Sequence, residues 1–269
     1  MKTIKIHKLG LLALFGVMVT GCAPIAVTGS ADVNQKAFGA KKKFAVVSIA
    51  SMKTLQGEQS ISQQLTSNDK IAGLNAQPIL DKLSPKIINS LGKSRHFSLL
   101  PEGKVLTSNA YKKLAEDDKS VKVLFMSVDM IAANNYKYIT ISDEKKYAKL
   151  ARDLGVDGVI GIQMNFSIAS SAWHVAGIGN KSYSSTVGIS AVAYNKDGDI
   201  IWKDSTVKEA EPGDSKAIIL IDPNAFSDTN FEKFHPSAVE IGGKAVDVLL
   251  ARFDDTMSGK GTSMFQSFK

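Results

Sequence analysis

The clearest pattern of apolar and polar positions in this chain lies between residues 142 and 168, where its period changes. In the first part, apolar residues recur at the spacing of one helix face: Tyr147, Leu150, Ala151 and Leu154. After Gly155 the apolar residues alternate with small or polar ones, at Ile160, Ile162, Met164, Phe166 and Ile168. The pattern therefore predicts a helix, with Ser142 as its N-cap, that is followed by a half-buried strand.

The other apolar patterns predict a sheet with helices packed on it. Phe44 to Ile49 is a short apolar run rich in β-branched residues, which is typical of a central strand buried on both faces. Residues 119–141 fit a helix or a strand, and the pattern leaves this open. Asn195 to Asp199 is predicted to be a hairpin turn. Helices are also expected over 78–92, 103–116 and from Pro236 onward, and strands over 97–100, 187–194 and 200–206. This order predicts an α/β sandwich with a mixed β-sheet, as a single domain over residues 44–256.

Residues 1–21 have the features of a secretory signal peptide, with three lysines before an apolar run that ends at a small-residue cleavage site. The last residues of this segment, with Cys22, resemble the bacterial lipobox, in which the cysteine is diacylated, the signal peptide is removed, and the cysteine becomes the acylated N-terminus. Cys22 is the only cysteine of the chain, so it cannot form an internal disulfide. We therefore expect Cys22 to be the lipid attachment site; the alternative is an ordinary secreted protein with an incidental cysteine.

Two flanking segments are expected outside the domain. Residues 22–43 are predicted to be a lipidated tether and residues 257–269 a flexible tail. Ala23 favours the outer membrane under the sorting rule of the lipoproteins that the chain resembles. The expected localisation is the outer membrane, lipid-anchored, with the domain in the periplasm.

Charge narrows the class of partner. The chain has a formal net charge of +7, and removal of residues 1–21 takes away three lysines, which leaves a net charge of about +4. This excess is too small and too dispersed for a nucleic-acid-binding protein. Lys41, Lys42 and Lys43 could favour anionic lipid headgroups by about 1 kcal/mol each, yet such a run before a strand is more often a solvated flank.

The sequence contains no recognisable catalytic motif, and we expect a protein that is not an enzyme and has no cofactor or metal. The mature histidines are His96, His174 and His235, and none has another histidine or a cysteine at ligand spacing. The loop over residues 171–182 is the best candidate for a partner contact. There Trp173, with His174 beside it, is an aromatic anchor among glycines; the alternative is a tryptophan folded back onto its own sheet.

Two stretches resemble a known superfamily. Ala148 to Ile162 runs from a helix through Gly155 and Asp157 into an apolar strand, and Val187 to Lys203 forms two strands around a glycine turn. These passages resemble the curli-secretion-channel lipoproteins and the related penicillin-binding-protein-activator lipoproteins. The resemblance implies a non-enzymatic periplasmic module that contacts other proteins or assembles into a ring.

We therefore expect an accessory or assembly factor for envelope machinery that acts through protein contacts, with an unknown envelope protein as partner. One alternative is an oligomeric, curli-type secretion channel, whose wall would come from segments 119–141 and 161–195. Another is an envelope small-ligand carrier or hydrolase, which no motif supports.

Overall fold

The computed structural model describes residues 31–57, 75–123, 126–170, 181–211, 219–221 and 232–260. Its strands are β1 (Asp32–Val33), β2 (Lys43–Met52), β3 (Gln56–Gly57), β4 (Ser98–Leu99), β5 (Ser120–Val123), β6 (Met126–Ala132), β7 (Gly158–Ser170), β8 (Lys181–Asn195), β9 (Ile200–Glu209) and β10 (Ile219–Ile221). Its helices are η1 (Gln35–Ala37), α3 (Gln77–Gly92), α4 (Glu102–Thr107), α5 (Asn109–Lys112), α6 (Glu144–Asp153) and α8 (Phe234–Met257).

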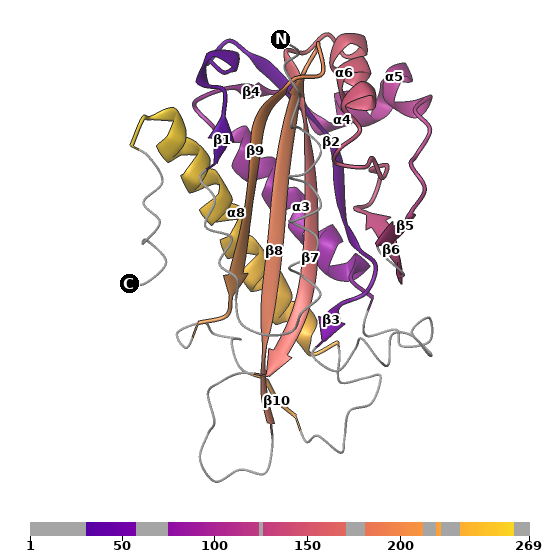
Figure 1. Cartoon of the computed structure of the whole chain (residues 1–269), viewed down its shortest axis with the longest axis vertical. Helices are drawn as coiled ribbons and strands as arrows, with labels where there is room; N and C mark the ends of the chain where they lie inside the picture. The colour runs from indigo at the N-terminus through magenta and orange to yellow at the C-terminus, as the bar shows by residue number, and fades with distance from the viewer. Residues whose placement is uncertain are drawn as a thin grey trace, which may run out of the picture.

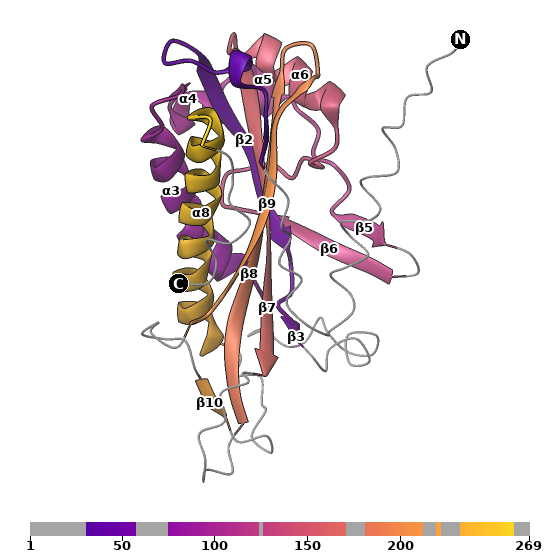
Figure 2. The ribbon, with the colours of Figure 1, turned by 60° about the vertical axis from the view of Figure 1, so that its left-hand side comes forward.

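The strands form a mixed sheet in the order β1-β9-β8-β7-β2-β6-β5, with β3, β4 and β10 paired to β7, β2 and β8. Strand β2 runs parallel to β7 and antiparallel to β6, while β7, β8 and β9 form antiparallel pairs. Figure 2 shows α3 and α8 on one side of this sheet and α6 on the other. The predicted fold class, an α/β sandwich with a mixed sheet, is confirmed.

The alternation of apolar and polar residues in β7 decides which of its faces packs against α3 and α8. The apolar residues from Ile160 to Ile168 are buried, and they share one core with the apolar faces of α3 and α8. Gln163, Asn165 and Ser167 lie on the opposite face and are partly exposed. Strand β2 is buried from Phe44 to Ser51, as expected of a central strand with helices on both sides.

The start of the domain differs from the prediction. The tether was expected to extend to residue 43, but β1 pairs with β9 and Phe38 is buried. The Phe38 ring stacks on Phe44 at a centroid distance of 5.0 Å and meets Phe253 edge-on at 5.1 Å. The pairing of β1 and the packing of Phe38 join residues 31–43 to the core, so the domain begins at or before Ala31. Residues 22–30 lie outside the described residues.

Two local predictions are also corrected, and one open assignment is decided. The helix expected over 103–116 is two short helices, because Ser108 has an extended backbone and its side chain accepts a hydrogen bond from the backbone N–H of Tyr111. The N-cap of α6 is Asp143 rather than Ser142, since the Asp143 carboxylate accepts from the backbone N–H of Lys146. The ambiguous segment 119–141 contains the β5–β6 hairpin, which is held by the pairing of β6 with β2.

Candidate functional site

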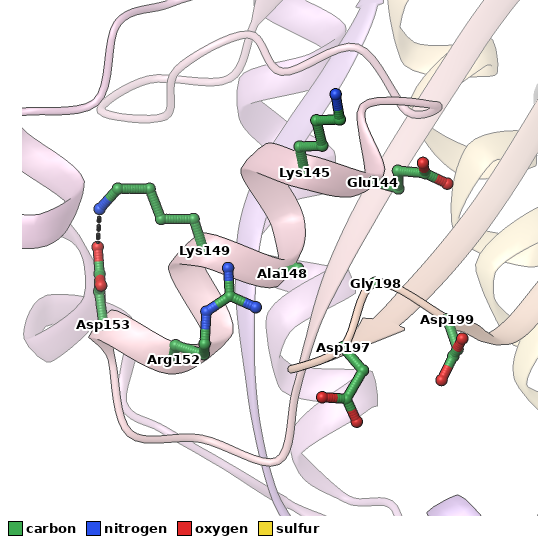
Figure 3. Close-up of a pocket in the computed structure, with 9 residues that line it drawn as sticks. All are labelled: Glu144, Lys145, Ala148, Lys149, Arg152, Asp153, Asp197, Gly198 and Asp199. Atoms are coloured by element: carbon green, nitrogen blue, oxygen red, sulfur yellow. Dashed lines mark hydrogen bonds and ion pairs between the residues drawn. The ribbon is translucent and has the colours of Figure 1, made fainter.

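The predicted site residues Cys22, Trp173 and His174 lie outside the described residues, so their roles stay predictions. The described residues offer a different candidate, a groove at the surface between α6 and the turn that joins β8 to β9. It has a volume of about 870 Å³ and opens to solvent (Figure 3). Its lining consists of Glu144, Lys145, Ala148, Lys149, Arg152, Asp153, Asp197, Gly198 and Asp199.

One wall of this groove, which we call the α6 groove, is the outer face of α6. The inner face of α6 is fixed to the sheet by Tyr147 and Leu150, both fully buried. The Tyr147 ring lies 5.0 Å from the Tyr194 ring, and burial raises the pKa of Tyr194 to about 12. The Tyr194 hydroxyl donates to the Ile141 carbonyl over 3.0 Å. The helix is thus held rigidly at both its inner face and its start, while its charged face stays open.

The other wall is the β8–β9 turn, which its own hydrogen bonds fix. The Asn195 side-chain oxygen accepts from the backbone N–H groups of Asp197 and Asp199, each over 2.9 Å. Gly198 has a φ of +91°, a conformation that side-chain-bearing residues rarely adopt, so glycine is required at this point of the turn. Gly198 also lies against Ala148 of α6. Turn and helix therefore keep a fixed separation.

The groove presents nearly balanced charge. Three cationic side chains come from α6, and four carboxylates come from α6 and the turn. Lys149 pairs with Asp153 along the helix, and Arg152 donates to the Lys196 carbonyl across the groove. Exposed pairs of this kind contribute little to stability. They can exchange partners at low cost, which suits contact with a charged surface of another molecule.

A smaller hollow of about 220 Å³ lies on the other side of the same turn, between η1 and β7. Here Asp157 accepts from the backbone N–H of Lys43 over 2.9 Å and lies 3.6 Å from the Lys42 ammonium group. The hydrogen bond from Lys43 is the main reason that the pKa of Asp157 falls below its ordinary value, and Lys42 adds to the shift. Asp157 therefore stays ionised and pins the start of β2.

The described histidines are far apart. His96 lies 3.2 Å from Asp254 near the end of α8, whereas His235 is in the first turn of that helix, about 28 Å away at 1.5 Å per residue. Among the described residues, no group of three or more histidine, cysteine, aspartate or glutamate side chains is arranged to hold a metal ion. In the same part of the chain, no helix has the length and apolarity needed to cross a membrane.

The structure brings together the two stretches that carry the family resemblance. Residues 158–162 of the first pair with residues 191–195 of the second in the β7–β8 ladder. The first stretch supplies the second half of the α6 wall, from Ala148 to Asp153, and the second stretch supplies the turn. Both stretches can be recognised in the sequence, but the groove between them cannot be predicted from it, although the repeated charges of α6 and the acidic turn are visible signals.

Comparisons with known proteins give only distant likenesses to solved structures. No protein-family profile matches the chain, and no curated protein sequence matches it. Among solved structures, the chain is similar to the LpoB C-terminal domain from Salmonella enterica, with 13% sequence identity and a TM-score of 0.31. The alignment covers 63% of this chain and 83% of that domain. At this distance the likeness carries no argument about function.

Proposed function

We propose that this protein is an outer-membrane lipoprotein, anchored through Cys22, whose periplasmic domain is an accessory or assembly factor for envelope machinery. It acts by contact with another protein rather than by catalysis, and the α6 groove is the contact surface. The lipobox supports the anchor, and the resemblance to envelope lipoproteins supports the class of activity.

One observation carries this proposal. The two stretches that resemble those lipoproteins are separated along the chain, yet they contribute to opposite walls of one open, charged groove on a rigid backbone. Neither the helix nor the turn needs its outer charges for the core, because α6 is held by its buried face and the turn by Asn195. Charged side chains that stand on a fixed backbone and are not used for stability are suited to recognition.

The anchor is tested by Cys22→Ala. We expect the variant to accumulate as unprocessed precursor or to appear in the soluble fraction, while the parent is extracted only with detergent. A matched control is Thr20→Ala, which keeps the cysteine and a small residue beside it. If Cys22→Ala were processed and membrane-held like the parent, the lipid attachment would be wrong.

The mode of action is tested by the mass of the lipoprotein in mild detergent, measured by light scattering after size exclusion. We expect a monomer or dimer of the 28.8 kDa chain, less its signal peptide. A discrete ring would instead favour the channel-type alternative and overturn the accessory role.

A further inference from the structure

The end of the domain at which β2 begins carries a dense group of basic side chains. The segments 35–43 and 93–100 contain no acidic residue. Hydrogen bonds join them side by side, from the Gly39 N–H to the His96 carbonyl over 2.7 Å and from the Ser98 N–H to the Lys42 carbonyl over 2.8 Å. Their exposed cations, which we call the basic corner, are Lys36, Lys41, Lys42, Lys43, Lys93 and Arg95.

The basic corner has a rigid base. Phe38 anchors the first segment between Phe44 and Phe253, and Phe97 anchors the second, with its ring 5.1 Å from Phe44. In Figure 1, β1, β4 and the start of β2 lie together at this end of the sheet. The lysines therefore project from a fixed surface rather than from a flexible tether.

Nearby carboxylates neutralise only part of this charge. Asp157 lies 3.6 Å from Lys42, and Asp254 lies 3.2 Å from His96. Across the corner, cations outnumber these two carboxylates. The Debye length of about 8 Å at physiological ionic strength keeps such an excess effective only at close range. The excess positive charge of the basic corner therefore suits a partner that is anionic and lies close to the domain.

The chain itself keeps such a partner nearby. Cys22 is nine residues before Ala31, where the described fold begins, so a fully extended connection spans at most about 30 Å. From Ala31 the chain passes through β1 directly into η1 and the basic corner. A lipid at Cys22 thus holds this corner within reach of the membrane surface.

We infer that the basic corner is a second membrane contact, which binds anionic lipid headgroups and orients the anchored domain. This inference rests on the proposed anchor at Cys22, which brings the corner to a membrane. Lysine and arginine beside an anionic bilayer each strengthen binding about fivefold. The corner therefore adds an electrostatic contact to the lipid anchor and fixes which end of the domain faces the bilayer.

The test uses the unacylated form, residues 23–269, whose deletion removes no described residue. Cosedimentation of the protein is measured with vesicles of phosphatidylcholine alone and with vesicles that contain equal amounts of phosphatidylcholine and phosphatidylglycerol. We expect binding to the anionic vesicles only, and its loss in high salt. The combined variant Lys36→Gln, Lys41→Gln and Lys93→Gln should lower the partition coefficient at least tenfold.

The matched control removes the same charge elsewhere, with Lys82→Gln, Lys112→Gln and Lys113→Gln, all exposed lysines on α3 or at α5. It should change the partition coefficient less than threefold. Equal loss in both variants, or equal binding to both vesicles, would overturn the inference. Because this form has no acyl chain, the result is independent of the Cys22→Ala experiment, so failure of the anchor and failure of the basic corner are told apart.

Discussion

At the scale of single residues, Asp204 of β9 is a carboxylate whose burial costs free energy. It is a carboxylate with 1% of its side chain exposed, and it faces α8 rather than solvent. Arg252 of α8 donates to both of its oxygens, over 2.8 and 3.1 Å, and the Ser205 N–H donates over 2.8 Å. Burial nevertheless raises the pKa of Asp204, with Arg252 opposing the shift. The pair joins the last helix to the sheet.

Arg252→Met should therefore destabilise the domain by about 3–5 kcal/mol at pH 7, because it leaves a buried charge without a partner. Because the pKa of Asp204 is raised in the folded state, the folded state binds a proton more tightly than the unfolded state does. The contribution of this proton to the free energy of unfolding is therefore present at low pH and is lost as pH rises through the folded-state pKa. Loss of Arg252 raises the pKa further and enlarges this effect. Urea unfolding at pH 4 and pH 7 should show the smaller loss at pH 4.

The control for this prediction is Lys86→Met, which removes an exposed ion pair between α3 and α8. Its cost should stay below about 1 kcal/mol at both pH values. An Arg252→Met variant with the same small, pH-independent cost would contradict the buried pair.

Phe38 is the residue that places the start of the domain. Phe38→Ala should cost about 3–5 kcal/mol, because the ring is buried among Phe44, Phe97 and Phe253. The neighbouring Lys36→Ala, at an exposed position, should change the free energy of unfolding by less than about 0.5 kcal/mol. If both variants unfolded like the parent, residues 31–43 would be a tether after all.

At the scale of elements, the position of α6 depends on the absence of a side chain at Gly161 of β7. A Cβ placed there would lie 2.1 Å from the Tyr147 hydroxyl and 2.8 Å from the ring. Because Tyr147 is fully buried, it has no room to withdraw, so Gly161 lets the helix approach the sheet closely.

Gly161→Ala should therefore lower stability by about 1–3 kcal/mol through overpacking and displace α6. Gly103→Ala in α4 is the matched change, since a Cβ there meets no atom within 4 Å; it should be neutral or stabilise by up to about 1 kcal/mol. Thermal unfolding followed by circular dichroism compares the two. Equal midpoints would show that α6 is not packed as described.

Elements with strong local patterns were predictable from the sequence, and those fixed by distant partners were not. The alternation in β7 and the apolar run of β2 report burial directly. Phe38 stands alone among small and polar residues, and its burial depends on Phe97 and Phe253, far along the chain. The α6 groove was missed for the same reason, because its walls come from separate stretches.

At the scale of the whole molecule, the α6 groove and the basic corner meet at the end of the sheet where β7 begins. The groove lies between α6 and the β8–β9 turn, while Lys42 of the corner lines the small hollow on the other side of that turn. A domain oriented by the corner would present the groove at a fixed height above the membrane. The two surfaces would then act together, one to orient and one to bind.

The most direct measurement is photo-crosslinking of the full-length protein in intact cells, with a benzoyl-phenylalanine placed at position Lys145 or Asp199, one on each wall of the groove. Control positions are Lys82 of α3 and Val248 of α8, which are exposed on the helices that cover the other side of the sheet (Figure 2). The account predicts one discrete adduct, shared by both groove positions and absent from the controls, that contains a second envelope protein. Adducts of equal yield from the control positions, or groove adducts made only of this protein, would contradict it.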